Sequence, residues 1–233
     1  MKKFGFIIFI IALIIGVVIA NLFSFGKVNA SNYINFSFDR SIKGSGNQVT
    51  ETRNVDEFFS VDASGVFKVE IISQKDFSVS VDADDNLLPH IKTEVKNGEL
   101  KIFSERRIKS SNPIRVRITA PNVERIEASG ATNIDISDLK NSSFEVDTSG
   151  ASKVKVSGET ADLNIDISGA GNVNSSGLTS QKAKVDASGA SRVSVNAVTE
   201  LDVDASGASN VTFSGSPVTI SKRSSGASKI TQE

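Results

Sequence analysis

Asp147-Thr148-Ser149-Gly150-Ala151-Ser152-Lys153-Val154 is the stretch that decides the fold, because close copies of it recur along the chain. Three further copies begin at Asp166, Asp186 and Asp204, and looser copies precede and follow them. The serine of each Ser-Gly pair stands at positions 129, 149, 168, 188, 206 and 225, so the steps are 18 to 20 residues. Self-similarity at a near-constant period is typical of a solenoid, in which each repeat stacks on the one before.

The residues beside each Ser-Gly pair alternate between apolar and polar, as in Phe144-Glu145-Val146-Asp147. This period-2 alternation predicts strands with one buried face. Stacked copies would align three inward columns: Phe144, Leu163, Ala183 and Leu201; Val146, Ile165, Val185 and Val203; Val154, Val173, Val193 and Val211. A second turn is expected after each Ser-Gly pair, at Ser137, Ser157-Gly158, Ser176-Gly177, Asn196 and Ser214-Gly215. Each period therefore predicts a two-sided rung of about 19 residues, closed by tight turns at both edges.

The Ser-Gly pairs predict the corners of the rungs. Glycine reaches φ > 0 without a Cβ clash, as a tight reversal requires. We expect the alanine after each pair to fill the narrow corner and the serines to make turn hydrogen bonds. The expected turn residues are Ser64, Gly65, Ser129, Gly130, Ser149, Gly150, Ser168, Gly169, Ser188, Gly189, Ser206, Gly207, Ser225 and Gly226.

A catalytic serine is the alternative interpretation of these pairs. A serine nucleophile needs a positioned base, and one such serine normally suffices. Six copies at a constant period, with His90 as the only histidine and no cysteine, favour a structural role. We therefore expect no catalytic residues, no cofactor and no enzyme activity. A polysaccharide lyase or esterase would instead need convergent carboxylates with a basic residue.

Two outward columns flank the Ser-Gly corner and form the candidate binding face. Two residues before the serine, the column is acidic; four residues after it, asparagines alternate with cations. The candidate residues are Asp147, Asp166, Asp186, Asp204, Lys153 and Arg192. Like charges about 4.8 Å apart repel, so the negative charge of the acidic column must be compensated by cations or hydrogen-bond donors. Adjacent lysines and arginines or turn amides would supply this compensation, and a ladder of divalent ions is the alternative; we expect no metal site.

The N-terminus predicts a membrane or targeting segment. Lys2-Lys3 precede an uncharged run over residues 4–25, which is long enough to cross a bilayer as a single helix. Val28-Asn29-Ala30 resembles a cleavage site, so a signal peptide is the alternative to a signal anchor. In both cases the positive-inside rule predicts export of the residues that follow. Localisation would be single-pass at the cell membrane, or secreted or periplasmic after cleavage near Ala30.

The rest of the chain divides by pattern into a polar linker over 31–50, an N-terminal β region over 51–121 and the repeat solenoid over 122–233. Asn97-Gly98 between alternating runs predicts a hairpin. Residues 31–233 carry a net charge of −4, without the clustered basic excess of a nucleic-acid surface.

Three smaller features have structural interpretations. Asp82, Asp84 and Asp85 lack the glycine and distal glutamate of an EF-hand loop and predict a solvated turn. Leu87 to Ile91 predicts a short helical turn. The small basic loop at Arg106, Arg107 and Lys109 is expected to be solvated.

The sequence resembles the head GIN domain family of putative autotransporter adhesins over about residues 50–230. The resemblance is carried by Gly44-Ser45-Gly46-Asn47, Val61-Asp62-Ala63-Ser64-Gly65, Asn97-Gly98-Glu99-Leu100, Ile118-Thr119-Ala120-Pro121-Asn122-Val123 and the Ser-Gly-Ala repeats. It implies an all-β, right-handed β-helix with two sheets, pectin-lyase-like in shape but without catalytic residues. Adhesion is the role usually proposed for the family. This chain has no lipobox cysteine, so a peptide anchor would replace a lipid one.

These patterns predict a non-catalytic cell-surface protein that binds an envelope polymer, a glycan or another protein through the solenoid face. An envelope scaffolding or sensing module, which could form homo-oligomers through its end rungs, is the alternative.

Overall fold

A computed structural model describes residues 41–233. The predicted membrane segment at residues 4–25 and the cleavage motif ending at Ala30 lie outside these residues. Within the described part, no helix is long and apolar enough to cross a membrane. Its regular structure is β-strand, apart from the 3₁₀-helix η2 (Leu88–His90), where the sequence predicts a short helical turn.

The strands fall into an N-terminal group and a repeat group. The first comprises β1 (Ile42–Lys43), β2 (Gln48–Arg53), β3 (Ser60–Gly65), β4 (Lys68–Ser73), β5 (Ser78–Asp84), β6 (Ile91–Lys96), β7 (Glu99–Ser104), β8 (Ile108–Lys109) and β9 (Arg115–Ala120). The second comprises β10 (Arg125–Gly130), β11 (Asn133–Thr148), β12 (Lys153–Ile167), β13 (Asn172–Ala187), β14 (Arg192–Ala205), β15 (Asn210–Ser214), β16 (Thr219–Ser224) and β17 (Lys229–Gln232).

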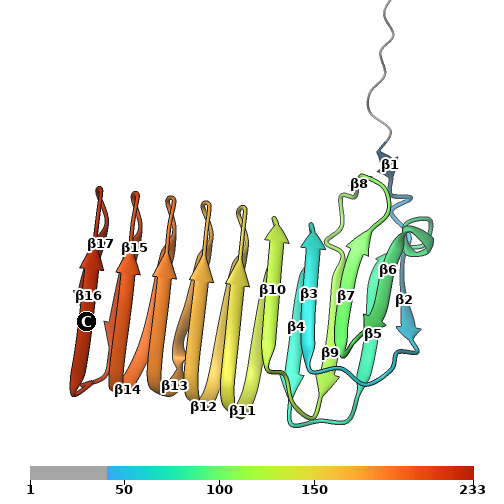
Figure 1. Ribbon diagram of the computed structural model, residues 1–233. Coiled ribbons are helices and arrows are strands. Elements are labelled where there is room, and N and C mark those ends of the chain that lie inside the picture. The colour runs from blue at the N-terminus through green and yellow to red at the C-terminus, as the bar shows by residue number, and fades with distance from the viewer. Residues whose placement is uncertain (1–40) are drawn as a thin grey trace, which may run out of the picture. The chain divides into compact units, whose positions relative to one another are not determined.

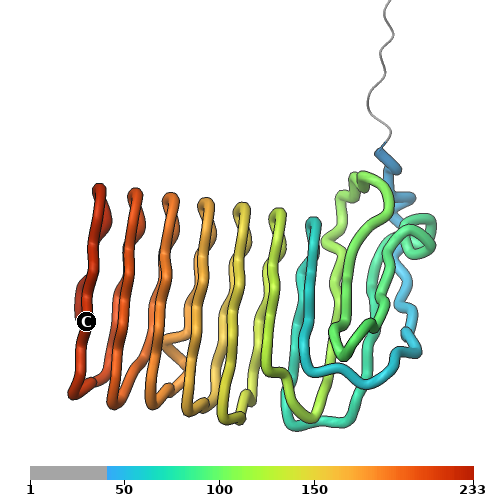
Figure 2. The backbone as a smooth tube through the Cα atoms, in the orientation of Figure 1, coloured from blue at the N-terminus to red at the C-terminus, as the bar shows by residue number. Residues whose placement is uncertain are grey.

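The repeat strands pair in parallel along two sides of a solenoid (Figure 1). The first sheet contains β3, β10, the C-terminal halves of β11 to β14, and β16. The second sheet contains β4, the N-terminal halves of β11 to β14, and then β15 and β17. Figure 2 shows the backbone passing through a narrow loop at one edge of each rung.

The inward columns predicted from the alternation form the core. Val146 aligns with Ile165, and Phe144 with Leu163, which is a step of 19 residues. Every member of the three predicted columns is at most 3% exposed. Complete burial of such aliphatic side chains stabilises a fold by about 1.5–3 kcal/mol each. The core is therefore built one layer per rung.

The edge opposite the Ser-Gly corners differs from the tight turn that was predicted. Strands β11 to β14 continue through it, with register shifts between Ile136 and Leu139 and between Lys155 and Ser157. A short segment that begins at Leu139 pairs with the next rung, and Leu139 points into the core with 1% exposure. A buried leucine widens this edge, so the chain turns over several residues.

The N-terminal group joins the solenoid in register. Ser64 and Gly65 of β3 pair with Ser129 and Gly130 of β10, although 65 residues separate them in sequence. At the start of the first sheet, the predicted Asn97-Gly98 turn joins β6 and β7 as an antiparallel hairpin. At the start of the second sheet, β9, β5 and β2 pair antiparallel. The parallel stack therefore begins against a mixed cap.

Candidate functional site

The Ser-Gly corners require glycine for two reasons. Six glycines have φ between 72° and 90°: Gly130, Gly150, Gly169, Gly189, Gly207 and Gly226. A Cβ atom at any of them would lie 2.4–2.7 Å from the carbonyl oxygen of the corner glycine in the preceding rung. That oxygen already accepts a hydrogen bond, as when Ala170 N–H donates to Gly150 O at 2.8 Å. The corners are therefore ladders of close backbone contacts.

The alanines do not fill the corner, so that prediction is wrong. Ala151, Ala170, Ala190 and Ala208 are exposed, whereas the residue after the alanine is buried in several rungs, as with Ser152 and Ser209. Glycine in the left-handed region reverses the chain. As a result, the side chain that points inward belongs to the residue after the alanine and not to the alanine itself. The predicted turn hydrogen bonds are confirmed: the Ser152 hydroxyl donates to Ser149 O at 3.0 Å and the Ser209 hydroxyl to Ser206 O at 2.7 Å.

The acidic residues align in one continuous column on the first sheet. Its members are Asp62, Glu127, Asp147, Asp166, Asp186 and Asp204, each opposite the next on neighbouring strands. Lys101 precedes Asp62 in the register and Arg223 follows Asp204, so a cation stands at each end. The acidic column thus brings together the four predicted aspartates and extends them across six strands.

Neighbouring cations neutralise much of the acidic column, as the sequence predicts. Arg125 contacts three carboxylates, including Glu127 at 2.8 Å and Asp147. Lys184 lies 3.3 Å from Asp186. Arg223 contacts Asp204 at 3.1 Å. These cations stand on the same face, where long side chains reach across strands that are about 4.8 Å apart.

Asp166 is the member of the acidic column that has no neighbouring cation in contact with it. Among the described residues its carboxylate makes no ion pair or hydrogen bond, and the residue is exposed. Burial raises the pKa of the neighbouring Asp147; Arg125 opposes this rise, while Glu145, Asp166 and Glu127 add to it. Burial likewise raises the pKa of Asp62, against the lowering effect of Lys101. Negative charge that no cation compensates is therefore concentrated near the middle of the acidic column.

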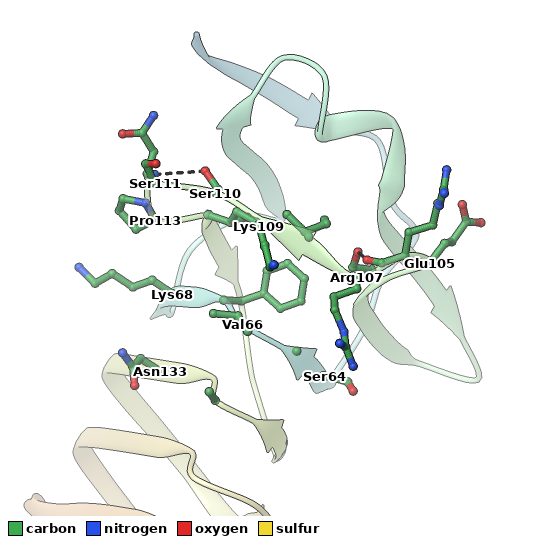
Figure 3. Close-up of a pocket in the computed structure, with 18 residues that line it drawn as sticks. Ser64, Val66, Lys68, Glu105, Arg107, Lys109, Ser110, Ser111, Pro113 and Asn133 are labelled. Carbon is green, nitrogen blue, oxygen red and sulfur yellow. Dashed lines mark hydrogen bonds between the residues drawn. The ribbon is translucent and has the colours of Figure 1, made fainter. Parts of the chain in front are cut away.

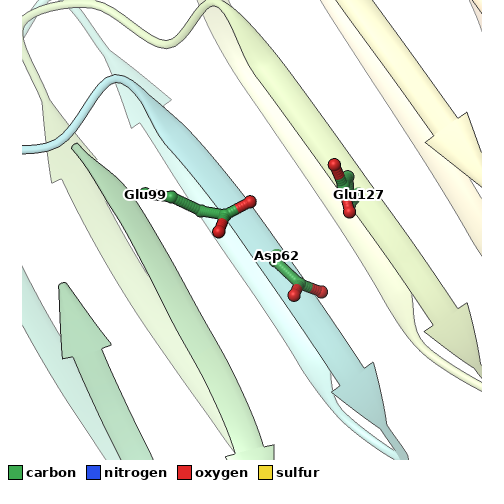
Figure 4. A group of neighbouring side chains, drawn as sticks. All are labelled: Asp62, Glu99 and Glu127. Carbon is green, nitrogen blue, oxygen red and sulfur yellow. The ribbon is translucent and has the colours of Figure 1, made fainter. Parts of the chain in front are cut away.

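Three carboxylates at the start of the acidic column meet closely. Oxygens of Asp62, Glu99 and Glu127 lie within 4.8 Å of one another, and Figure 4 shows Glu99 extending from β7 towards Asp62 on β3. Lys101 approaches Glu99 to 2.8 Å and Asp62 to 3.5 Å, so an ammonium group already contacts two of the three. An internal cation thus supplies the charge that a metal ion would bring.

Lys153 and Arg192 do not join the acidic column. They belong to a second column, on the second sheet, whose aligned members are Asn133, Lys153, Asn172, Arg192, Asn210 and Lys229. The corner reverses the chain, so residues before and after the Ser-Gly pair lie on opposite sheets. The predicted candidate face is therefore two faces of opposite charge.

The prediction of a solvated acidic turn at Asp82, Asp84 and Asp85 is wrong for two of the three residues. Asp82 and Asp84 are 9% and 1% exposed. The Asp84 carboxylate accepts hydrogen bonds at 3.0 Å from both Ser110 and Asn112. The bond from Asn112 is the main cause that lowers the pKa of Asp84. Asp84 thus anchors the loop that contains β8.

This fold and its repeated polar columns define a β-solenoid with extended outer faces. A family model described as "Putative auto-transporter adhesin, head GIN domain" matches residues 57–217. The chain belongs to this family, as the repeats suggest.

Solved structures share the fold. A putative adhesin from Bacteroides fragilis is similar with a TM-score of 0.68 at 19% identity, over 83% of this chain and 100% of that one. A putative adhesin from Parabacteroides merdae gives 0.54 at 17% identity, over 83% and 99%. A protein named as a putative lipid binding protein, from Parabacteroides distasonis, gives 0.50 at 18% identity, over 83% and 100%. A search of curated proteins found no match.

Proposed function

We propose that this protein is a non-catalytic surface protein that binds an extended partner through the acidic column. The observation that carries the proposal is the register of six carboxylates across six neighbouring strands. A groove of about 450 Å³ runs beside it, lined by Asp62, Glu127, Asp147 and Asp166. Solenoids use long, repetitive surfaces of this kind for binding.

The chemistry of the column indicates the class of partner. Ionised carboxylates only accept hydrogen bonds, so the partner must donate them. The spacing of about 4.8 Å repeats along the column, which favours a polymer with regularly placed donors over a compact ligand. A glycan or another envelope polymer rich in hydroxyl or ammonium groups fits this description.

A catalytic role has less support. Serine recurs at six near-identical corners, whereas an active site normally uses a single nucleophile beside a positioned base. The hydroxyls of Ser168 and Ser188, which belong to Ser-Gly pairs, donate to backbone carbonyl oxygens of the preceding rung, those of Thr148 and Ile167. These serines are therefore occupied in holding the corner.

The proposal is tested with a protein of residues 41–233, which carry their own core. A variant with Asp147, Asp166, Asp186 and Asp204 all changed to Asn keeps the size of every side chain. We expect its binding to intact bacterial cells and to immobilised envelope polymers to fall at least about tenfold, because charge-assisted hydrogen bonds become neutral ones. Wild-type binding should also weaken as salt rises.

The matched control is Lys153→Gln with Arg192→Gln, which removes charge from the second sheet. This variant should bind as the wild type does. Equal binding by the four-site variant and the wild type would exclude the acidic column, and a wild-type protein that binds neither cells nor polymers would exclude adhesion.

We further propose that residues 4–25 anchor the protein in the membrane and that the solenoid is exported. The family match and the uncharged run after Lys2-Lys3 support this. The intact mass of the protein recovered from membranes tests it: a chain that begins at Met1 supports an anchor, and one that begins at Ser31 supports cleavage.

A further inference from the structure

A second candidate site lies where the first Ser-Gly corner meets the loop that contains β8. We call it the roof pocket: its floor is Ser64 to Lys68, its roof is Ser104 to Ile114, and Ala131 and Asn133 complete one side. Its volume is about 950 Å³, within the range of small-molecule sites. No carboxylate of the acidic column lines it, and Ser64 is the one lining residue that it shares with the groove beside that column.

The roof is fixed in place by two sets of contacts. Strand β8 pairs in parallel with β1, where Ile42 N–H donates to Arg107 O and Gly44 N–H to Lys109 O, both at 2.8 Å. The buried Asp84 accepts hydrogen bonds from Ser110 and Asn112 beyond β8. The pocket is therefore held open by backbone pairing and a buried carboxylate.

The roof brings positive charge into the pocket. Figure 3 shows the Arg107 side chain extending from the roof towards Ser64, and Lys109 on the same side of the cavity. Glu105 is the single acidic residue in the lining, and Arg107 makes no ion pair among the described residues. By contrast, Lys68 at the floor already contacts Glu70 at 2.7 Å. A guanidinium group without a carboxylate partner is suited to a carboxylate or phosphate ligand.

Apolar side chains also line the roof pocket, alongside several serines and asparagines. Val66, at the tip of the first corner, is 71% exposed and faces this cavity. Phe67, Ile108, Pro113 and Ile114 extend the apolar surface behind it. Exposed apolar surface beside the guanidinium group of Arg107 favours a ligand that has both an anionic and an aliphatic part.

We propose that the roof pocket binds an anionic amphiphile, with a carboxylate or phosphate head at Arg107 and an alkyl chain along Val66. This site goes beyond the proposed binding of a polymer by the acidic column and does not depend on it. The head group replaces water at the guanidinium, and the chain removes Val66 from solvent.

The test uses residues 41–233 and isothermal titration calorimetry at ligand concentrations below micelle formation. Dodecanoate and dodecyl phosphate are the two anionic probes, and their relative affinities distinguish a carboxylate head from a phosphate head. We expect dodecyltrimethylammonium, acetate and inorganic phosphate each to bind at least about tenfold more weakly, because each lacks one of the two parts.

Variants then locate the binding. Arg107→Gln should weaken dodecanoate about tenfold, whereas Arg192→Gln, which removes an arginine outside the pocket, should have no effect. Val66→Ser should weaken it severalfold, whereas Val218→Ser should not, although Val218 is also exposed, at 89%. Unfolding transitions of all four variants confirm that they are folded.

Three results would overturn the proposal. One is equal binding of the cationic and anionic amphiphiles, and another is binding of inorganic phosphate as tight as that of dodecyl phosphate. The third is unchanged affinity in Arg107→Gln, or equal losses in the pocket variants and their controls.

Discussion

At the scale of the residue, the corner glycines show how one missing atom permits close stacking. Gly169 has φ of 90°, and its absent Cβ would lie 2.7 Å from Gly150 O. Gly46 has nearly the same φ, 88°, but nothing lies within 4 Å of its Cβ position. The two sites therefore separate the conformational role of glycine from its steric role.

We predict that Gly46→Ala lowers the free energy of unfolding by about 1–2 kcal/mol, the cost of a left-handed alanine. Gly169→Ala should lower it by about 1–3 kcal/mol more, because two backbones must also move apart. Urea denaturation of both variants measures the difference. Equal losses would show that contact between corners does not limit the stacking.

At the scale of the element, the acidic column makes the first sheet sensitive to pH. Burial and neighbouring carboxylates raise the pKa values of Asp62 and Asp147 above the ordinary 3.8. The folded state then holds protons more tightly than the unfolded chain does, so protonation stabilises the fold. Asp84 and Asp85 behave oppositely, because hydrogen bonds from Asn112 and Ser45, respectively, are the main causes that lower their pKa values.

We therefore expect the melting temperature to rise as pH falls from 7 to about 4, and to fall below about 4. Asp147→Asn should reduce the rise in melting temperature between pH 7 and about 4. Asp84→Asn should reduce the fall in melting temperature below about pH 4. Thermal unfolding at low salt measures both. A melting temperature that falls steadily from pH 7 would contradict a destabilising acidic column.

The repeat period predicts which residues align on neighbouring strands, but it does not predict which partners their side chains contact. Alternation over 19 residues correctly places Phe144 opposite Leu163, because stacking preserves sequence position. It does not predict that Arg125 spans three carboxylates, since that depends on side-chain length and direction. The roof pocket carries no periodic signal, because its roof, which includes Arg107, comes from a segment outside the repeats, although Val66 directly follows an early copy of the repeat. The right-handed sense of the coil stays a prediction.

At the scale of the whole molecule, the last rung explains how open strands avoid pairing with another copy. Lys222 on β16 is aligned with the buried Val203, so it occupies an inward position. Its Nζ lies 4.3 Å from the centre of the Phe213 ring, over the end of the core. An inward charge on an edge strand opposes stacking, because a second copy would have to bury it.

We predict that Lys222→Val causes residues 41–233 to associate at concentrations where the wild type stays monomeric. Light scattering across a concentration series measures this. The control is Lys229→Val, which removes the same charge from an outward position of the same rung. Association of both variants to the same extent would attribute the effect to net charge, and monomers in all three would exclude the role of Lys222.

The constant step between partners also has a consequence for how the chain folds. From β12 onward, the partner of each new strand has already been synthesised about one period earlier, as Val185 follows Ile165. The entropy of closing that loop is the same for every rung and does not grow with the number of rungs. The mixed cap offers the first template, and each completed rung is the template for the next. The polypeptide can thus assemble vectorially, from its N-terminus to its C-terminus, while the remainder is still emerging.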